Sequence, residues 1–229
     1  MASITSPGAL SRSVLADQVK DRLLEDILAG KYAPDARIVE TQVARELGTS
    51  QAPVREALRG LEALGVVEIT PFRGARVRRP TRRELLEAYA VRSVLETLGA
   101  RLAMPQLDDD DVAALTGHVD AMQAAAKAGD GHGVAEADAR FHGRIVEIAR
   151  NRTLEKVWRS LEPFSRTYIT LVVPGADPQW SADLHTPILH AIRDHDTEAV
   201  VRALERHFAE VSANMASRLP EGDEDERNA

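Results

Sequence analysis

The sequence predicts a mainly α-helical protein of two domains, in which a small N-terminal domain with one β-hairpin precedes a larger, all-helical domain. The chain has 229 residues, more than the ~100–150 residues of a typical single domain. Aromatic residues make up only 4% of it, whereas hydrophobic residues make up 44%. A core built mostly from Leu, Val, Ile and Ala favours packed helices over a β-sandwich.

The composition also excludes several classes of protein. The chain has no cysteine, which excludes a disulfide scaffold, a Cys-ligated zinc finger and a thiol nucleophile. Its longest apolar runs, such as residues 169–174, fall far short of the ~20 residues of a membrane span. The first seven residues lack the basic and apolar regions of a signal peptide. We therefore expect a cytoplasmic protein without a membrane partner.

Three helices and a hairpin are expected in the N-terminal third. Apolar residues at helical spacing predict helices over residues 14–29, 40–47 and 50–64. Gly30 is a suitable stop for the first helix, and Ser50 is a good N-cap for the third, with Pro53 in its first turn. Residues 66–77 alternate around a turn that contains Gly74. This order of elements is that of a winged helix-turn-helix.

From Arg82 onward every segment has a helical pattern. The expected helices cover residues 82–104, 108–127, 131–149, 151–173, 178–194 and 196–217. We accordingly divide the chain into a disordered N-terminus (1–10), a winged helix-turn-helix domain (11–79), an all-helical bundle (80–219) and an acidic disordered tail (220–229).

Charge is distributed unevenly between these domains. Residues 11–83 contain 14 Lys and Arg against 10 Asp and Glu, whereas residues 84–229 contain 15 against 26. A basic N-terminal part joined to an acidic remainder favours nucleic-acid binding. The alternative is an ordinary solvated face, since charge balance indicates partners but not fold.

The third predicted helix carries a polar face suited to reading DNA. Gln51, Arg55 and Arg59 follow one another at intervals of four residues, away from the apolar stripe. In a helix-turn-helix the second helix of the pair lies in the major groove, where Arg pairs with guanine and Gln with adenine. The Ser50 end of this helix could hold a phosphate, and Arg73 and Gly74 at the hairpin tip could reach phosphate or the minor groove. The alternative is an exposed amphipathic helix with ordinary surface arginines.

A resemblance adds to this interpretation. The pattern is Ile27-x-x-Gly30, Pro34, Glu40-x-x-Val43-Ala44-x-x-Leu47-Gly48-x-Ser50-x-x-Pro53-Val54-Arg55-Glu56-Ala57-Leu58-x-x-Leu61, Gly65 and Pro71-x-Arg73-Gly74-Ala75-x-Val77. It resembles the winged helix of the GntR family, which implies a transcription factor with Ser50, Gln51, Ala52 and Arg55 at the groove. Gln51 stands where the family often has Arg, Thr41 where some members have Arg, and Asp35 where the usual residue is Gly. The first two differences bear on the operator sequence rather than on the fold.

An acid and three histidines in the helical domain form a candidate metal site. Asp138 and His142 lie four residues apart, on one helix face, and His185 and His207 lie on later helices with apolar neighbours. Groups from three helices can converge inside a bundle, and imidazoles with one carboxylate suit Zn²⁺, Ni²⁺, Mn²⁺ or Fe²⁺. The alternative is two core histidines and one Asp–His hydrogen bond.

The helical domain also has a family resemblance. Its pattern is Val91-Arg92-x-x-Leu95-Glu96, Asp138-x-x-Phe141-His142, Ala149-x-Asn151, His185-x-x-Ile188-Leu189-x-Ala191-Ile192, Asp196, Ala199 and His207. It resembles the FCD effector domain of FadR-like GntR regulators, so that the two resemblances cover about residues 12–217. The resemblance implies that Asp138, His142, His185 and His207 bind a metal, for which we expect zinc.

The residues also suggest how an effector could be held. Open metal positions could accept the carboxylate of a small organic acid, and Arg92, Arg166 and Tyr168 could pair with that ligand if they point inward. Alternatively, Arg92 pairs with Glu96 four residues later.

Together these features predict a homodimeric transcriptional repressor. It would bind a palindromic double-stranded operator and release it when a small organic acid binds. Activation instead of repression stays open. Two other functions remain as alternatives: a metalloenzyme that uses the Asp and three His, for which we see no further catalytic residues, and a regulator whose metal is purely structural.

Overall fold

The computed structural model describes residues 9–71, 73–167 and 177–219. The chain divides into two compact units, Met1–Arg79 and Pro80–Ala229, and each is considered by itself. The expected disordered tail over 220–229, and the expected disordered N-terminus up to residue 8, lie outside the described residues. None of the described helices is both long and apolar enough to cross a membrane.

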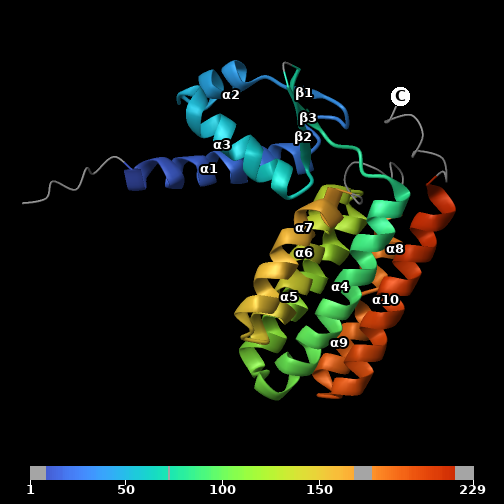
Figure 1. The fold of residues 1–229 in the computed structure, drawn as a ribbon. Coiled ribbons are helices and arrows are strands. Elements are labelled where there is room, and N and C mark those ends of the chain that lie inside the picture. The colour runs from blue at the N-terminus through green and yellow to red at the C-terminus, as the bar shows by residue number, and fades with distance from the viewer. Residues whose placement is uncertain (1–8, 72, 168–176, 220–229) are drawn as a thin grey trace, which may run out of the picture. The chain divides into compact units, whose positions relative to one another are not determined.

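The first unit is a winged helix-turn-helix, as predicted (Figure 1). Its elements are α1 (Ala9–Leu28), β1 (Arg37–Ile38), α2 (Glu40–Glu46), α3 (Gln51–Ala63), β2 (Val67–Thr70) and β3 (Gly74–Val77). Helix α3 packs against both α1 and α2, and the apolar faces of these helices form the core of the unit. Leu23, Ile27, Leu58 and Leu61 are almost completely buried there. Helix α1 begins at Ala9, earlier than the expected residue 14, so the expectation of disorder is wrong for residues 9 and 10.

The wing is a three-stranded antiparallel sheet of order β1-β3-β2 rather than a two-stranded hairpin. Val67 pairs with Val77 and Thr70 with Gly74, which is the expected hairpin. The unexpected strand β1 lies on the other side of β3, where it pairs Ile38 with Ala75. Two residues are too few to show an alternating pattern, so no sequence signal predicts this strand.

Asp35 adopts a backbone conformation that favours glycine. Its φ of 67° lies in the left-handed region, which Asp tolerates better than most side chains. Its backbone N–H donates to the carbonyl of Val77 at 2.9 Å, and its carboxylate pairs with Arg79 at 3.2 Å. The turn before β1 is therefore fixed to the end of the wing.

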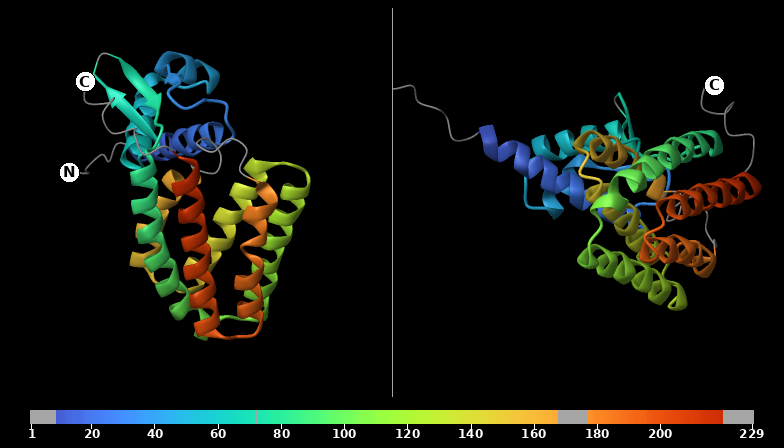
Figure 2. Two further views of the ribbon diagram at one scale, coloured as in Figure 1. Left: turned by 90° about the vertical axis from the view of Figure 1, so that its right-hand side faces the viewer. Right: turned by 90° about the horizontal axis from the view of Figure 1, so that it is seen from below.

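The second unit is an all-helical bundle, as predicted, and Figure 2 shows its long helices running side by side. Its elements are α4 (Arg82–Ala103), the 3₁₀ turn η1 (Met104–Gln106), α5 (Asp109–Lys127), α6 (Gly131–Ile148), α7 (Arg152–Thr167), α8 (Pro178–Asp183), α9 (Thr186–Arg193) and α10 (Thr197–Arg218). Helix α4 packs against α6, α7 and α10. Phe141, Ile188, Leu204 and Met215 are essentially inaccessible to solvent within this core. Thr81 starts α4 with a capping box to Glu84.

The prediction of one helix over residues 178–194 is wrong, because the chain turns between α8 and α9. Pro187 explains the break: in a continuous helix it would offer no N–H and its ring would clash with the carbonyl of Asp183. At the second position of α9 the same proline is tolerated, and His185 becomes the residue that precedes the helix. Of the expected helix over 151–173, α7 covers residues up to Thr167, and residues 168–173 lie outside the description.

Candidate metal centre

Four side chains from separate parts of the helical unit converge in its interior. Helix α6 supplies Asp138 and His142 from one face, the turn between α8 and α9 supplies His185, and α10 supplies His207. One possible ligand atom from each residue lies within 4.8 Å of all the others. Their exposed fractions are 7%, 0%, 0% and 5%, respectively. The four residues that the sequence singled out are therefore brought together in a site closed to bulk water.

The ligand atoms of three of these residues point toward one another. The Nε2 atoms of His142 and His185 are 3.1 Å apart. The Oδ1 atom of Asp138 lies 3.0 Å from Nε2 of His185 and 3.7 Å from Nε2 of His142. The break at Pro187 contributes directly to this geometry, because it sets His185 at a turn facing α6.

The other ring nitrogen of each of these two histidines faces an acceptor. Nδ1 of His185 lies 3.0 Å from the carbonyl oxygen of Ser181, and Nδ1 of His142 lies against Oε2 of Glu96. Since a carbonyl and an ionised carboxylate can only accept, both Nδ1 atoms carry the hydrogen. In neutral rings the two Nε2 atoms are then bare lone pairs facing each other at 3.1 Å. Such facing lone pairs repel each other, and a divalent metal ion bound by both nitrogens would remove that repulsion, so the residues fit a bound metal ion.

The surroundings of the cluster favour a neutral imidazole at His207 and an ionised carboxylate at Asp138, the forms in which these side chains can bind a metal. Burial lowers the pKa of His207 well below its usual value, and the neighbouring His185 and His142 lower it further. This imidazole is therefore neutral, and its buried Nδ1 has no hydrogen-bond partner among the described residues. Burial opposes ionisation of Asp138, but the nearby His142, His185 and Arg92 outweigh it and lower the pKa of its carboxyl below the ordinary range. One carboxylate with neutral imidazoles is a donor set for first-row divalent metals.

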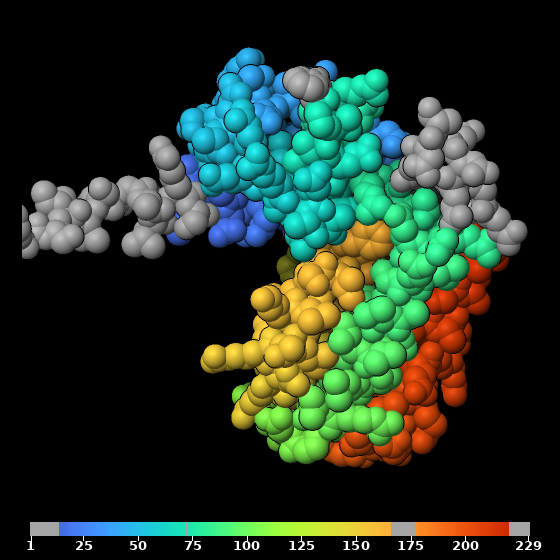
Figure 3. All heavy atoms as spheres, viewed as in Figure 1, coloured from blue at the N-terminus to red at the C-terminus, as the bar shows by residue number. Residues whose placement is uncertain are grey.

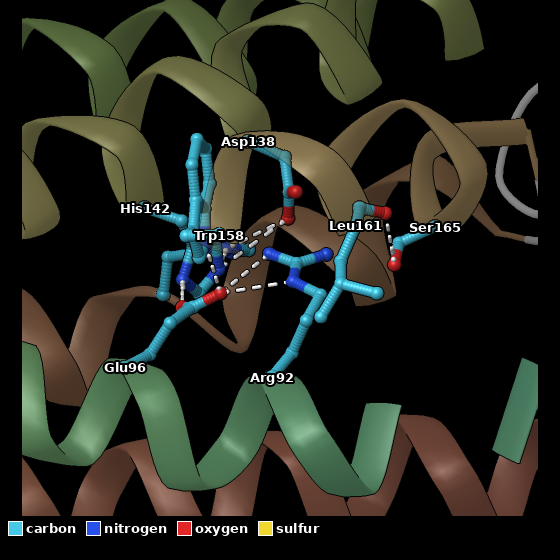
Figure 4. Close-up of polar contacts among 8 residues, drawn as sticks. Arg92, Glu96, Asp138, His142, Trp158, Leu161 and Ser165 are labelled. Carbon is cyan, nitrogen blue, oxygen red and sulfur yellow. Dashed lines mark hydrogen bonds and ion pairs between the residues drawn. The ribbon is translucent and has the colours of Figure 1, made fainter. Parts of the chain in front are cut away.

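Glu96 contacts His142 and also pairs with the buried guanidinium of Arg92 (Figure 4). Its Oε1 accepts hydrogen bonds from Nε of Arg92 at 2.9 Å and from Nε1 of Trp158 at 2.7 Å. Burial raises the pKa of Glu96, but Arg92 and His142 outweigh it and lower that pKa to about 2. Glu96 is thus a buried anion that fixes the orientation of His142. The sequence showed its spacing from Arg92 but gave no sign of its contact with His142.

The residues expected to contact an effector are only partly described. Arg92 is 3% exposed, and its guanidinium pairs with Glu96, with the rings of Tyr89 and Phe208 each 5.5 Å from its central carbon. The pairing with Glu96 is the alternative that the sequence left open for this residue. The side chain of Arg166 and the whole of Tyr168 lie outside the described residues.

The residues expected to contact DNA lie on the surface of the first unit. Ser50, Gln51, Ala52, Arg55 and Arg59 are all exposed on α3, opposite the buried stripe of that helix. Ser50 occupies the N-cap position, but its side chain makes no capping hydrogen bond. Arg55 is 54% exposed, and its guanidinium pairs with Glu40 of α2 at 3.0 Å.

The wing supplies the two remaining residues of the expected DNA surface. Arg73 is exposed beside β3. Gly74 has a φ of 83°, a left-handed conformation that favours glycine at this turn.

Comparisons with known proteins agree with both units. Residues 15–77 match the family model of bacterial regulatory proteins of the gntR family, and residues 87–210 match the FCD domain. The "Probable D-xylose utilization operon transcriptional repressor" of Paenarthrobacter nicotinovorans is 34% identical over 87% of this chain and 88% of its own length. The gluconate operon transcriptional repressor of Bacillus licheniformis is 26% identical over 90% of this chain and 87% of its own length.

Solved structures share the fold. McbR/YncC of Escherichia coli superposes with a TM-score of 0.75 at 24% identity, over 89% of this chain and 97% of that one. A GntR transcriptional regulator of Rhodococcus sp. RHA1 gives a TM-score of 0.81 at 24% identity, over 90% of this chain and 99% of that one. At this level of identity the likeness concerns the arrangement of helices and strands.

Proposed function

The chain belongs to the GntR family of bacterial regulatory proteins and carries an FCD domain, and from this premise we propose that it is a metal-containing repressor controlled by a small organic acid. As a member of this family it is a transcriptional regulator that binds DNA, and not an enzyme. The metalloenzyme alternative is therefore set aside. The metal, the effector and the homodimer are the parts that we propose.

The metal proposal rests on the two facing histidines. Asp138, His142, His185 and His207 would hold a divalent ion, with zinc as the first candidate and nickel, manganese or iron as the others. When bound, the metal supplies a positive Lewis-acidic centre that can accept a carboxylate oxygen. The chain itself orients the two rings. Glu96 contacts Nδ1 of His142 and the carbonyl of Ser181 contacts Nδ1 of His185, so that both Nε2 atoms face the centre of the cluster.

The effector proposal follows from the charges around this centre. An organic acid would bring a carboxylate, for which the metal and a guanidinium are the natural partners. Arg92 lies beside the cluster and remains charged, because the attraction of Glu96 outweighs burial and raises the pKa of its guanidinium. We retain Arg92, Arg166 and Tyr168 as its proposed contacts. Binding would change operator affinity only if the acid prefers one of two dimer geometries.

Metal content tests the first part of the proposal. The His185→Ala variant removes one facing imidazole, whereas His190→Ala removes an exposed histidine of α9 as a matched control. After reloading with zinc and desalting, we expect one metal ion per chain in the wild type and in His190→Ala, and loss of binding in His185→Ala. Equal metal content in the two variants would contradict the assignment.

Effector binding tests the second part. We expect calorimetric titration with a panel of small organic acids to give a signal with the metal-loaded protein, and a much weaker one after chelation. If chelation lowers thermal stability but leaves the affinity for a binding acid unchanged, the metal is structural and the effector does not reside on it.

DNA binding tests the recognition surface. Two copies would place α3 in two half-sites of a palindrome about one helical turn apart. Loss of one Arg–guanine contact costs ~1–3 kcal/mol, which is a ~5- to 150-fold weaker affinity. We expect Arg55→Ala to weaken specific binding in gel shifts by this amount at unchanged melting temperature, and exposed Arg202→Ala of α10 to have no effect. Equal binding by wild type and Arg55→Ala would refute the assigned role.

A further inference from the structure

The outward face of α4 carries a stripe of large apolar side chains in contact with solvent. Val91, Val94 and Leu98 are 48%, 68% and 45% exposed, although the same helix buries its opposite face in the core. Spacings of three and four residues place these three side chains on one side of the helix. Such a contiguous apolar face on an otherwise charged surface is typical of a protein interface.

The same stripe ends in opposite charges at equal distances from its centre. Glu87 lies seven residues before Val94 and Arg101 lies seven residues after it, and both are exposed. Seven residues are close to two full turns, so both charged side chains lie on the side of the helix that carries Val94. The stripe therefore runs from an acid through apolar residues to a base.

We propose that this stripe is a homodimer surface on which the α4 helices of two copies pack antiparallel, with the two-fold axis passing at Val94. A two-fold axis brings each residue before Val94 opposite the residue equally far after it in the second copy. Glu87 then faces Arg101 of the second copy, twice, and Leu98 faces the small Ala90. Parallel packing would instead set Glu87 against Glu87 and Arg101 against Arg101, which is unfavourable.

Neighbouring helices extend this surface and leave the stripe accessible. Figure 3 shows α4 lying across the front of the bundle between α7 and α10. Val157 of α7, a helix that packs against α4, is a further exposed apolar side chain, at 41%. Arg101 also pairs with Glu198 of α10, and Glu87 with Arg83, so the facing charges would join into networks. Exposed ion pairs contribute little to affinity. Here they would determine the register of the two α4 helices, while burial of the apolar side chains would stabilise the dimer.

This inference deepens the homodimer that is part of the proposed function, by naming the surface that forms it. It depends on neither the metal nor DNA. A test that detects the contact between two copies therefore gives an answer even where the effector or operator part of the proposal fails.

Single cysteines give the sharpest test, because the chain has none of its own. Val94→Cys would place two thiols against each other at the two-fold axis, near the range over which disulfides form. We expect mild oxidation, or a short bis-maleimide, to convert most of this full-length variant to a covalent dimer on non-reducing gels. Ala213→Cys on the exposed side of α10 is the matched control and should remain uncrosslinked at the same concentration. Equal cross-linking of both variants would overturn the inference.

Charge variants test the antiparallel register. We expect Val94→Glu to shift the dimer toward monomer in sedimentation equilibrium, with the circular dichroism unchanged because this side chain is largely exposed within one chain. Glu87→Arg should weaken the dimer several-fold, and the double variant Glu87→Arg/Arg101→Glu should restore it.

Different failures of these tests have different meanings. A Val94→Glu protein with wild-type dimer affinity would overturn the surface while leaving a homodimer through another face. A monomeric wild type would overturn the homodimer itself.

Discussion

A single carboxylate, that of Glu96 on α4, contacts the cluster of Asp138 and three histidines through His142 of α6. It is 1% exposed and contacts His142, Arg92 and Trp158. A buried charge is costly unless it is paired and hydrogen-bonded, and these three partners meet both conditions. Glu96 is therefore a positioning residue, which holds the proton of His142 on Nδ1 and leaves Nε2 for a metal.

Replacing the carboxylate of Glu96 should lower the affinity of the protein for a metal ion. Glu96→Gln keeps the shape of the side chain but removes the charge that orients His142. We expect the affinity for zinc to fall ~10- to 100-fold, the usual cost of losing such an outer partner. Competition with a chromophoric chelator measures it, and exposed Glu205→Gln of α10 is the control. Unchanged zinc affinity in Glu96→Gln would show that Glu96 does not position the ligand.

The residues of the site could be predicted from the sequence where they lie close together along the chain or where a family resemblance indicated them. The four-residue spacing of Asp138 and His142 placed both on one helix face, and the resemblance supplied His185 and His207. The contact between Glu96 and His142 joins α4 to α6, and it depends on how far one helix slides along the other. No local pattern encodes that offset, so Glu96 was recognised only as a partner for Arg92.

At the scale of elements, two glycines show how closely the helices pack. A Cβ added at Gly143 of α6 would lie 3.1 Å from Cη2 of Trp158, whose indole N–H is held by Glu96 at 2.7 Å. A Cβ at Gly117 in the middle of α5 would meet nothing within 4 Å. Gly143 therefore permits the close approach of α6 and α7, whereas Gly117 has no such role.

The same substitution should have opposite effects at these two positions. Gly117→Ala should stabilise the protein by ~0.5–1 kcal/mol, because alanine favours the helix and fills open space. Gly143→Ala should destabilise it by ~1–3 kcal/mol, because the tethered indole cannot move away without losing its hydrogen bond. Urea unfolding of the two variants measures the difference. Equal stabilisation by both would mean that the contact with Trp158 relaxes at no cost.

Elements with a sustained 3.6-residue period were predicted well, and those without one were not. Helices α4, α5, α6 and α10 lie close to their expected ranges because each has a long apolar face and clear end signals. Strand β1 was missed because it exists only by pairing with β3, and the break before α9 because periodicity outweighed Pro187. The side chain of Arg166 and the whole of Tyr168 lie outside the described residues, so their expected role in the site stays a prediction.

For the whole molecule, the uneven charge makes DNA binding depend strongly on salt. The protein has a net charge of −7, so attraction to phosphate must come from the locally basic first unit. We expect log K to fall linearly with log salt concentration, by ~0.9 per neutralised phosphate. Arg73→Ala should weaken binding to all sequences alike and reduce the slope by ~1, whereas Arg55→Ala should mainly reduce discrimination between sequences. Fluorescence anisotropy with specific and non-specific DNA over a series of salt concentrations measures the slope and the discrimination between sequences. A slope that Arg73→Ala leaves unchanged would exclude a contact between Arg73 and phosphate.

Metal removal should affect only one of the two units. Asp138, His142, His185 and His207 all belong to Pro80–Ala229, and so do both tryptophans of the chain, Trp158 and Trp180. With free zinc at a thousand times its dissociation constant, binding stabilises this unit by ~4 kcal/mol. We expect chelation to lower its unfolding midpoint, monitored by tryptophan fluorescence, and to leave that of the His185→Ala variant unchanged. A chelator effect of equal size in both proteins would place the stabilising ion elsewhere.

Helix α4 presents Arg92 and Glu96 to the interior and Val91, Val94 and Leu98 to solvent, all within two turns. An α-helix resists twisting about its long axis. A rotation of α4 by a few degrees that makes room for an effector on its buried side therefore turns its exposed apolar stripe through the same angle. If an effector binds beside the cluster and two copies pair through this stripe, as proposed, such a rotation of α4 would change the angle between the two subunits without any relay of side chains.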